Sequence, residues 1–239
     1  MTEPKSSAPA VRLREIISRT DPALPAAYAL LNATFARHER VTLNEWRAVL
    51  REREEEVWTD FAWHLLIAEQ RGEVVGLATG TFVGSANVAM IGYLAMAPST
   101  RGGGIGTQLR DRLRHAFERD ARRLGRPLAA ILGEVSHENP WLRALSRRPK
   151  VLVLDLPYYQ PSLRFLDSSS PFVLYYEACG PARPYLPMLE LRRILFAIWR
   201  ESYRLGRPLE HRAFRRMMRA LDGRRHVGPH PDFPQPSAP

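Results

Sequence analysis

The order of apolar and polar residues predicts a chain in which strands and helices are mixed. Apolar residues alternate loosely in residues 11–18, which is typical of a strand. In residues 21–35, and again from residue 42 onward, apolar residues recur three and four positions apart, which is typical of two helices. The stretch 37–40 between them is polar. The chain is therefore predicted to open in the order strand, helix, helix.

Three β-type runs and one long amphipathic helix come next. Residues 64–68 and 73–82 are apolar runs joined by Gln70-Arg71-Gly72, and the glycine suits a tight hairpin. A further apolar run covers residues 88–96. From Gly104 onward the apolar residues fall on one stripe at helical spacing, so this helix is expected to lie on the sheet.

The second half continues the alternation and then becomes helical. Strands are predicted over residues 127–135, 151–156 and 172–178, with a short helix opened by Asn139-Pro140 between the first two. The chain turns helical after Pro187. This order predicts a mixed α/β sheet with helices on both faces and a helical C-terminal extension.

Composition sets the expected domain boundaries. Residues 1–10 and 223–239 are rich in polar residues, proline or glycine and are predicted to be disordered tails. One α/β domain is expected over residues 11–180. The extension, residues 181–222, is expected to pack on this domain or on a partner subunit, which would suit a homodimer.

The charge of the chain raises the question of a nucleic-acid partner. The formal net charge is +10, with an arginine-rich stretch over residues 192–225. Lysine occurs only at Lys5 and Lys150, so nearly all the positive charge is arginine, as a GC-rich coding bias would produce. We therefore favour a solvated face or an inter-subunit surface, and a nucleic-acid partner is the less favoured interpretation.

Cysteine and histidine usage narrow the chemistry. A single cysteine, Cys179, excludes an internal disulfide and a cysteine metal cluster. The scattered histidines make no metal-ligand spacing, so no metal site is expected. No run approaches about 18 apolar residues and the N-terminus lacks an apolar segment behind a basic start, so we expect a cytoplasmic protein without a membrane partner.

The strongest chemical signal is a glycine turn between the apolar run 88–96 and the long helix. It reads Arg101-Gly102-Gly103-Gly104-Ile105-Gly106. A strand that feeds through such a turn into a helix gathers unpaired backbone N–H groups and the positive end of the helix dipole, which favours a phosphate. A dinucleotide fingerprint fails because its sixth position is Thr107, and a Walker loop fails because it needs a lysine.

The spacing that fits is R-x-x-G-x-G, filled by Arg101, Gly104 and Gly106 after a strand that ends at Pro98. With the helix that follows, it resembles the acetyl-coenzyme A loop of the GCN5-related N-acetyltransferase (GNAT) superfamily. The resemblance covers residues 11–178. It implies an acyl-CoA N-acyltransferase fold whose central strands splay apart, so that pantetheine lies between them.

The resemblance also implies a set of cofactor-binding residues. The backbone of the strand before the loop would hold pantetheine, and an N–H there would polarise the thioester carbonyl. The loop and the helix start would hold the pyrophosphate. The implied residues are Leu94, Ala95, Met96, Arg101, Gly102, Gly103, Gly104, Ile105, Gly106, Thr107 and Asn139.

The function expected from this resemblance is transfer of an acetyl group from acetyl-CoA to a primary amine of a small molecule or peptide. Direct attack is expected because Cys179 is not positioned to form an acyl-enzyme. Two alternatives stay open. One is a non-catalytic acyl-CoA-binding or sensory protein with the same fold, and the other is an arginine-rich nucleic-acid-binding protein.

Catalysis by direct attack needs a base for the ammonium and an acid for the leaving thiolate. Glu134 follows a buried strand at its end, where partial burial would raise its pKa toward that of a useful base. The tyrosine that relatives carry on the next helix is missing here, so Tyr158 and Tyr159 are the candidates for the acid. The expected substrate-binding residues are Glu39, Arg40, Tyr93 and Gln160.

Overall fold

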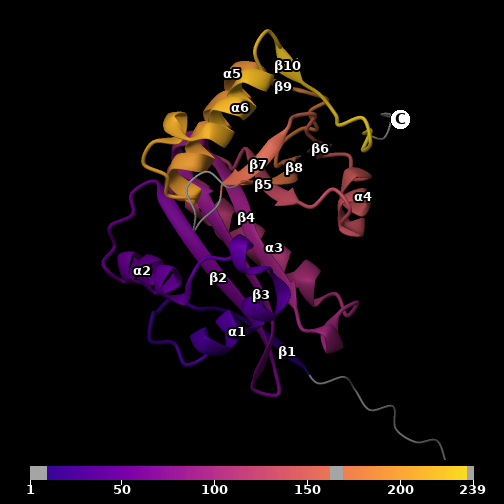
Figure 1. Cartoon of the computed structure of the whole chain (residues 1–239). Helices are drawn as coiled ribbons and strands as arrows, with labels where there is room; N and C mark the ends of the chain where they lie inside the picture. The colour runs from indigo at the N-terminus through magenta and orange to yellow at the C-terminus, as the bar shows by residue number, and fades with distance from the viewer. Residues whose placement is uncertain (1–9, 162–168, 236–239) are drawn as a thin grey trace, which may run out of the picture.

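Strands make up the centre of the molecule, and helices cover both sides (Figure 1). The computed structural model describes residues 10–161 and 169–235. The strands are β1 (Val11–Glu15), β2 (Phe61–Gln70), β3 (Glu73–Val83), β4 (Val88–Met96), β5 (Ala130–Val135), β6 (Val151–Val153), β7 (Tyr158–Pro161), β8 (Ser169–Ala178), β9 (Leu186–Pro187) and β10 (His226–Val227). The helices are α1 (Leu24–Thr34), α2 (Leu43–Glu54), α3 (Ile105–Arg123), α4 (Pro140–Ser146), α5 (Met188–Ala197) and α6 (Arg212–Ala220).

The main sheet has the order β1-β2-β3-β4-β5-β8-β6, and β7 pairs with β8. All of its neighbours are antiparallel except β4 and β5. The parallel pairing begins at Val88 with Ala130 and ends at Ile91 with Gly133, although both strands run on. The two central strands therefore separate beyond Ile91, as the resemblance implied.

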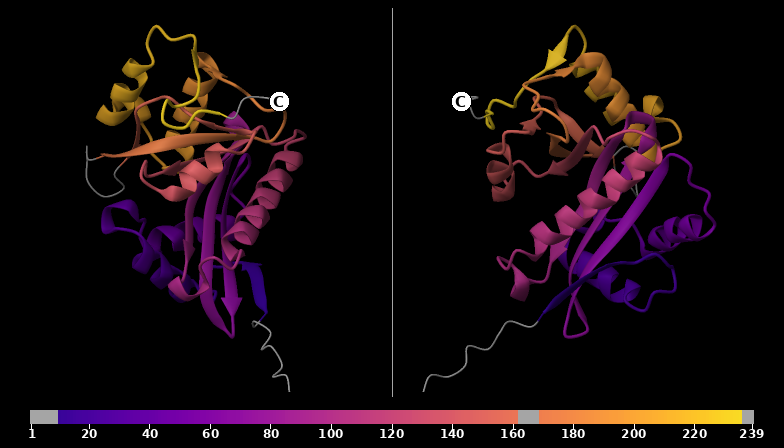
Figure 2. Two further views of the ribbon diagram at one scale, coloured as in Figure 1. Left: turned by 90° about the vertical axis from the view of Figure 1, so that its right-hand side faces the viewer. Right: turned by 180° about the vertical axis from the view of Figure 1, so that it is seen from behind.

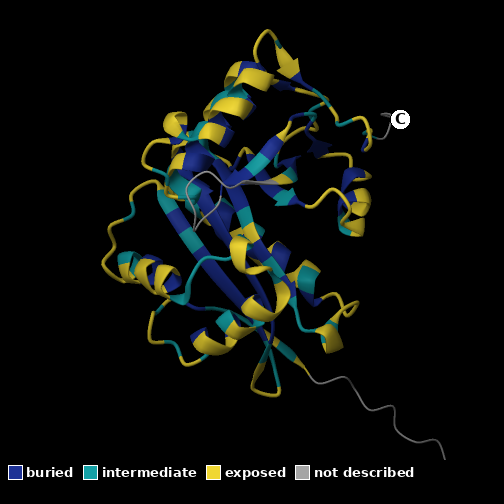
Figure 3. Cartoon of the chain, in the orientation of Figure 1, coloured by how far each residue is buried: buried dark blue, intermediate teal, exposed yellow. Residues whose placement is uncertain are grey.

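Helices lie on both faces of the sheet, which Figure 2 shows edge-on in its left view, with α3 on one side and α1 and α2 on the other. Leu109, Leu113 and Phe117 of α3 are fully buried against the sheet, which accounts for the apolar stripe in the sequence. Burial is concentrated in the strands, and the outward faces of the helices are exposed (Figure 3). The predicted mixed α/β fold is confirmed.

Local sequence explains where α2 begins. Thr42 accepts a hydrogen bond from the backbone N–H of Glu45 at 3.1 Å, and the carboxylate of Glu45 accepts one from the backbone N–H of Thr42 at 2.5 Å. This reciprocal pair is a capping box, which satisfies backbone donors that a helix start otherwise leaves unpaired. The cap also fixes the position of Glu45, which lines a cavity described below.

The C-terminal extension packs on the sheet of its own chain. Side chains of α5 and α6 share one buried cluster with β5 and β8, in which Leu195, Trp199 and Phe214 are almost completely buried. The helix predicted after Pro187 changes at Ile198 into a π-helical turn, η4 (Ile198–Ser202). This turn brings the residues just after it against the central strands β2, β3 and β4.

Two expectations are corrected by the fold. The prediction of a disordered tail from residue 223 is wrong for residues 223–235, because β10 pairs with β9 and the side chains of Val227 and Phe233 are buried. Burial of these apolar side chains offsets the entropy cost of ordering the segment. The predictions for residues 1–9 and 236–239 lie outside the described residues.

The other correction concerns residues 158–161, which lie outside the predicted strands 151–156 and 172–178 and form β7 against β8. None of the helices that the structure describes is long and apolar enough to cross a membrane.

Candidate active site

The glycine turn lies between β4 and α3 and forms the floor of a cleft. Gly104 is the N-cap of α3 with φ +76°, and no side chain caps this helix. Gly102 also has a positive φ, +82°. Side chains rarely adopt this backbone conformation, which explains the glycines at both positions. The uncapped helix start leaves its N–H groups available to an anion.

Most of the predicted cofactor residues line this cleft. They are Leu94, Met96, Arg101, Gly102, Gly104, Ile105, Gly106 and Thr107. Ala95 points the other way, into the core beside α1, so only its backbone faces the separated edge of β4. Arg148, which follows α4, also lines the cleft and was missed by sequence reasoning because 42 positions separate it from Gly106.

A second cavity occupies the gap where β4 and β5 separate. Ile91, Gly92 and Leu94 line it from β4, and Gly133, Glu134 and Val135 line it from β5. Leu94 and Trp141 line both this cavity and the glycine-turn cleft, so the two adjoin. A Cβ on Gly133 would lie 2.4 Å from the hydroxyl of Tyr175, which explains the glycine there.

Asn139 lies at the same cavity and begins α4. Its side-chain oxygen accepts a hydrogen bond from the backbone N–H of Trp141 at 3.0 Å. The side chain therefore serves as a helix cap.

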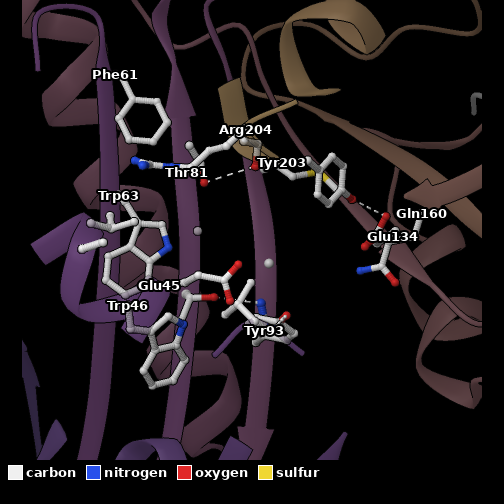
Figure 4. Close-up of a pocket in the computed structure, with 18 residues that line it drawn as sticks. Glu45, Trp46, Phe61, Trp63, Thr81, Tyr93, Glu134, Gln160, Tyr203 and Arg204 are labelled. Carbon is white, nitrogen blue, oxygen red and sulfur yellow. Dashed lines mark hydrogen bonds between the residues drawn. The ribbon is translucent and has the colours of Figure 1, made fainter. Parts of the chain in front are cut away.

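Glu134 stands where this gap meets a third cavity, which we call the acceptor cavity (Figure 4). Burial raises the pKa of its carboxyl to about 7, because an ionised carboxylate is poorly solvated there. The hydroxyl of Tyr203 donates a hydrogen bond to Glu134 Oε2 at 2.5 Å and lowers that pKa in part. Such a carboxyl exchanges its proton near neutral pH, which suits a general base.

The acceptor cavity lies between α2, the central strands and η4. The lining residues are Val41, Glu45, Trp46, Ala48, Val49, Phe61, Trp63, Thr79, Gly80, Thr81, Met90, Gly92, Tyr93, Glu134, Gln160, Ser202, Tyr203 and Arg204. Figure 4 shows Phe61, Trp63 and Trp46 on one side and Tyr203, Glu134 and Gln160 on the other. The hydroxyl of Ser202 donates to that of Thr81 at 3.2 Å, which ties η4 to β3.

The predictions for the acid are corrected by the geometry of β7. Alternate residues of a strand point to opposite faces, so Tyr158 and Gln160 face the Glu134 side and Tyr159 does not. The guanidinium of Arg216 lies 5.1 Å from the centre of the Tyr159 ring. Tyr159 therefore lies outside the site.

Tyr158 is near Glu134 but enclosed. Its side chain is 1% exposed, and its hydroxyl lies 3.2 Å from the hydroxyl of Tyr203. Burial raises its pKa well above 10, and the charge of Glu134 raises it further. A phenol of this kind is a poor proton donor, so Tyr158 does not fit the role of the acid.

Of the four expected substrate-binding residues, two line the acceptor cavity and two do not. Gln160 and Tyr93 line the acceptor cavity. The hydroxyl of Tyr93 donates to the carbonyl oxygen of Glu39 at 2.7 Å and accepts from the N–H of Val41 at 3.1 Å, so it holds the segment before α2. Burial raises its pKa above the ordinary value.

Glu39 and Arg40 do not line the acceptor cavity. Glu39 lies at the gap between β4 and β5, and its carboxylate accepts a hydrogen bond from the N–H of Ala36 at 3.0 Å. Arg40 donates to the side chain of Asn32. Their role in substrate binding stays a prediction.

Histidines come together at one place that the sequence spacing did not indicate. His137, His230 and Asp232 have side-chain atoms within 4.8 Å of one another. His137 Nε2 lies 2.8 Å from a carboxylate oxygen of Asp232, and the backbone N–H of Asp232 donates to His230 Nδ1 at 3.2 Å. These hydrogen bonds account for the contact and hold the C-terminal segment beside the start of α4.

Several arginines of the basic stretch 192–225 form ion pairs. Arg192 pairs with Asp222, Arg207 with Glu210 and Arg224 with Asp155. These partners neutralise part of the charge that suggested a nucleic-acid partner.

Comparison with known proteins agrees with this fold. Residues 27–128 match the acetyltransferase (GNAT) family. A Bacteroides thetaiotaomicron protein assigned to the GNAT acetyltransferase family superposes with a TM-score of 0.57 at 17% identity, over 81% of this chain and 99% of that one. The ribosomal-protein-alanine N-acetyltransferase of Brucella melitensis gives 0.50 at 22% identity, over 70% and 99%. A search of curated proteins finds no match.

Proposed function

We propose that this chain, whose residues 27–128 match the acetyltransferase (GNAT) family, transfers an acetyl group from acetyl-CoA to a primary amine. The observation that carries this proposal is the position of Glu134. Its carboxyl, with a pKa near neutrality, lies where the gap between β4 and β5 meets the acceptor cavity.

The residues of the cleft fit acetyl-CoA. Gly102 and Gly104 leave the backbone open to close approach, and the uncapped start of α3 offers N–H groups and a positive dipole end to a pyrophosphate. Arg101 and Arg148 add positive charge around it. The free edge of β4 after Ile91 is where pantetheine would lie. When bound, acetyl-CoA supplies an acetyl group activated as a thioester.

Glu134 acts on the acceptor. An amine in water is protonated at neutral pH and cannot attack a carbonyl carbon until it loses a proton. A carboxylate whose pKa is about 7 can take that proton when the amine is held against it. The neutral nitrogen then forms the new bond to the acetyl carbon, and the carbon–sulfur bond breaks. The nitrogen loses a second proton as it becomes an amide, and the departing CoA thiolate takes up one proton.

Tyr203 and Tyr158 hold the base in place. The hydroxyl of Tyr203 donates to the Glu134 carboxylate, and the enclosed hydroxyl of Tyr158 lies within hydrogen-bond distance of Tyr203. These contacts fix the orientation of the Glu134 carboxylate. We assign both tyrosines positioning roles.

Two measurements test the proposal. Calorimetry with acetyl-CoA is expected to show binding that Gly106→Asp abolishes, because a carboxylate at the helix start repels the pyrophosphate. Thiol release in the presence of amines then separates an enzyme from a non-catalytic sensor of acyl-CoA. Binding without thiol release from any amine would favour the sensor. Absence of acetyl-CoA binding would contradict both.

A further inference from the structure

One wall of the acceptor cavity is aromatic. Phe61 and Trp63 contribute to it from β2 and Trp46 from α2, with the two tryptophan rings 6.0 Å apart between centroids (Figure 4). Val49 and Met90 extend the apolar surface. A polar body placed against this wall would lose water and find only the two indole N–H groups as hydrogen-bond partners among these side chains, whereas an apolar one gains by burial.

The charges around the cavity favour a cation. Among its described lining residues, the charged side chains are Glu45, Glu134 and Arg204. Arg204 is neutralised by Glu52, to which it donates two hydrogen bonds of 2.7 Å, and its guanidinium lies 5.6 Å from the centre of the Phe61 ring. The pairing leaves the carboxylates of Glu45, at the rim, and of Glu134 without a cationic partner among the described lining residues.

The two ends of the cavity differ in chemistry. Glu134 and Gln160 stand opposite the aromatic wall, so an amine nitrogen at Glu134 directs the rest of its molecule toward the tryptophans (Figure 4). Arg204 is occupied by Glu52, so no described lining residue offers an unpaired cationic side chain to a carboxylate. An acceptor with an acidic group would meet Glu45 instead.

We propose that the acceptor is an arylalkylamine, that is, a primary amine on an aromatic body that carries no carboxylate. This inference rests on the proposed acetyl transfer and names its substrate class. Its ammonium is attracted by the carboxylates of the cavity, and its ring packs against Trp63 and Trp46. A small polar amine fills only the Glu134 end of the cavity and leaves the aromatic wall without a contact. An amino acid brings a carboxylate, and the cavity offers no unpaired cationic side chain to neutralise it.

The test compares three amines that differ in one group each: phenethylamine, ethanolamine and phenylalanine. Thiol release from saturating acetyl-CoA gives kcat/KM for each. A hydrophobic pocket discriminates roughly 10- to 200-fold per methylene-sized group, so phenethylamine is expected to exceed ethanolamine by about 100-fold. The kcat/KM of phenylalanine is expected to be lower than that of phenethylamine by a similar factor, because its carboxylate finds no cationic partner in the acceptor cavity.

A variant series locates the effect. Trp63→Ala is expected to reduce the ratio of phenethylamine to ethanolamine at least tenfold, and Trp63→Phe to keep most of it. Leu189→Ala is the control, because Leu189 is 63% exposed and lies outside the acceptor cavity. Should Trp63→Ala fail to fold, binding of phenethylamine to the wild type, followed through quenching of tryptophan fluorescence, gives the same information about the ligand class.

The outcomes separate the inference from the function on which it rests. Thiol release with no preference for phenethylamine overturns the arylalkylamine class and leaves acetyl transfer intact. Saturable binding of phenethylamine without thiol release supports the ligand class and overturns the transferase proposal. Neither binding nor thiol release overturns both.

Discussion

The glycine-turn cleft and the acceptor cavity differ in how far apart along the chain their walls lie. The cleft is formed almost entirely by residues 94–110, with two contributions from the region of α4. The side chains that line the acceptor cavity belong to residues scattered along the chain between positions 41 and 204. The cleft offers backbone groups of one continuous turn, whereas the cavity offers side chains that only packing brings together. One can be recognised from a short stretch of sequence and the other cannot.

The difference also predicts how each part responds to substitution. In the cleft, a change is expected to alter acetyl-CoA binding because backbone conformation does the binding. In the acceptor cavity, a change is expected to alter catalysis or substrate choice because individual side chains act. The following substitutions test this contrast.

Glu134→Gln is expected to have the largest effect. The amide cannot take a proton, so kcat is expected to fall about 10²- to 10⁴-fold. Acetyl-CoA affinity, measured by calorimetry, should change little because the pyrophosphate cleft is untouched. Glu138→Gln is the control, since Glu138 is an exposed carboxylate four positions further on. A variant that keeps full kcat would remove Glu134 from the reaction.

His64→Leu tests the support of α3, which carries the cleft. His64 is buried and lies 2.7 Å from carboxylate oxygens of both Glu15 and Asp120, so it ties β1 and α3 to β2. Removing a buried charge partner typically costs about 3 kcal/mol of unfolding free energy. His115→Leu is the matched control, because His115 is exposed on the same helix and contacts only the backbone of its own turn among the described hydrogen bonds.

The same variant gives a pH test. Burial lowers the pKa of His64, but the hydrogen bonds to Asp120 and Glu15 outweigh it and raise the pKa above 6.5. A raised pKa means that the charged form stabilises the fold fully below about pH 6.5 and loses that effect as the pH rises through the folded-state value. Denaturant unfolding should therefore show the wild-type advantage shrinking toward alkaline pH. An advantage that grows with pH would mean that the imidazole is neutral.

Tyr203→Phe is expected to have a smaller effect on the same base. In the wild type, the hydrogen bond from Tyr203 lowers the pKa of Glu134. Without this bond, the pKa of Glu134 is expected to rise above about 7. Less of the base is then deprotonated at pH 7, and a hydrogen bond to a charged group is worth about 2 kcal/mol. The acid limb of the kcat profile should move to higher pH. Tyr185→Phe, at a half-exposed ring remote from the site, should leave the profile unchanged.

Gly104→Ala is expected to have the smallest effect and to act on the cleft alone. A side chain in the left-handed region costs about 1–2 kcal/mol, so acetyl-CoA is expected to bind roughly tenfold more weakly. The control is Gly103→Ala, because Gly103 lacks a positive φ and a Cβ there meets its nearest atom at 3.4 Å. Equal weakening in both variants would contradict the role assigned to the turn conformation.

Much of the fold could be predicted from the sequence because its signals are local. The apolar stripe of α3, the hairpin at Gly72 and the Thr42 cap depend on residues a few positions apart. The glycine turn belongs to this group. The ordering of residues 223–235 could not be predicted, because Val227 and Phe233 are isolated apolar residues whose burial depends on surfaces formed elsewhere.

The candidate site divides in the same way. Glu134 could be placed at a strand end from sequence, but the partner that fixes it could not, because Tyr203 follows a π-helical turn 69 positions further on. Tyr158 and Tyr159 look equivalent in the sequence, and only the pairing of β7 with β8 turns one toward Glu134 and the other toward Arg216.

The sequence by itself determined the glycine turn and the alternation of elements, since backbone conformation and apolar spacing are properties of contiguous residues. The tertiary structure decided the acceptor side. Trp46, Trp63 and Arg204 carry no pattern that joins them, and their shared cavity arises only because α2 and the turn after α5 pack at the same part of the sheet. Side-chain contacts across such distances depend on packing, which no local spacing encodes.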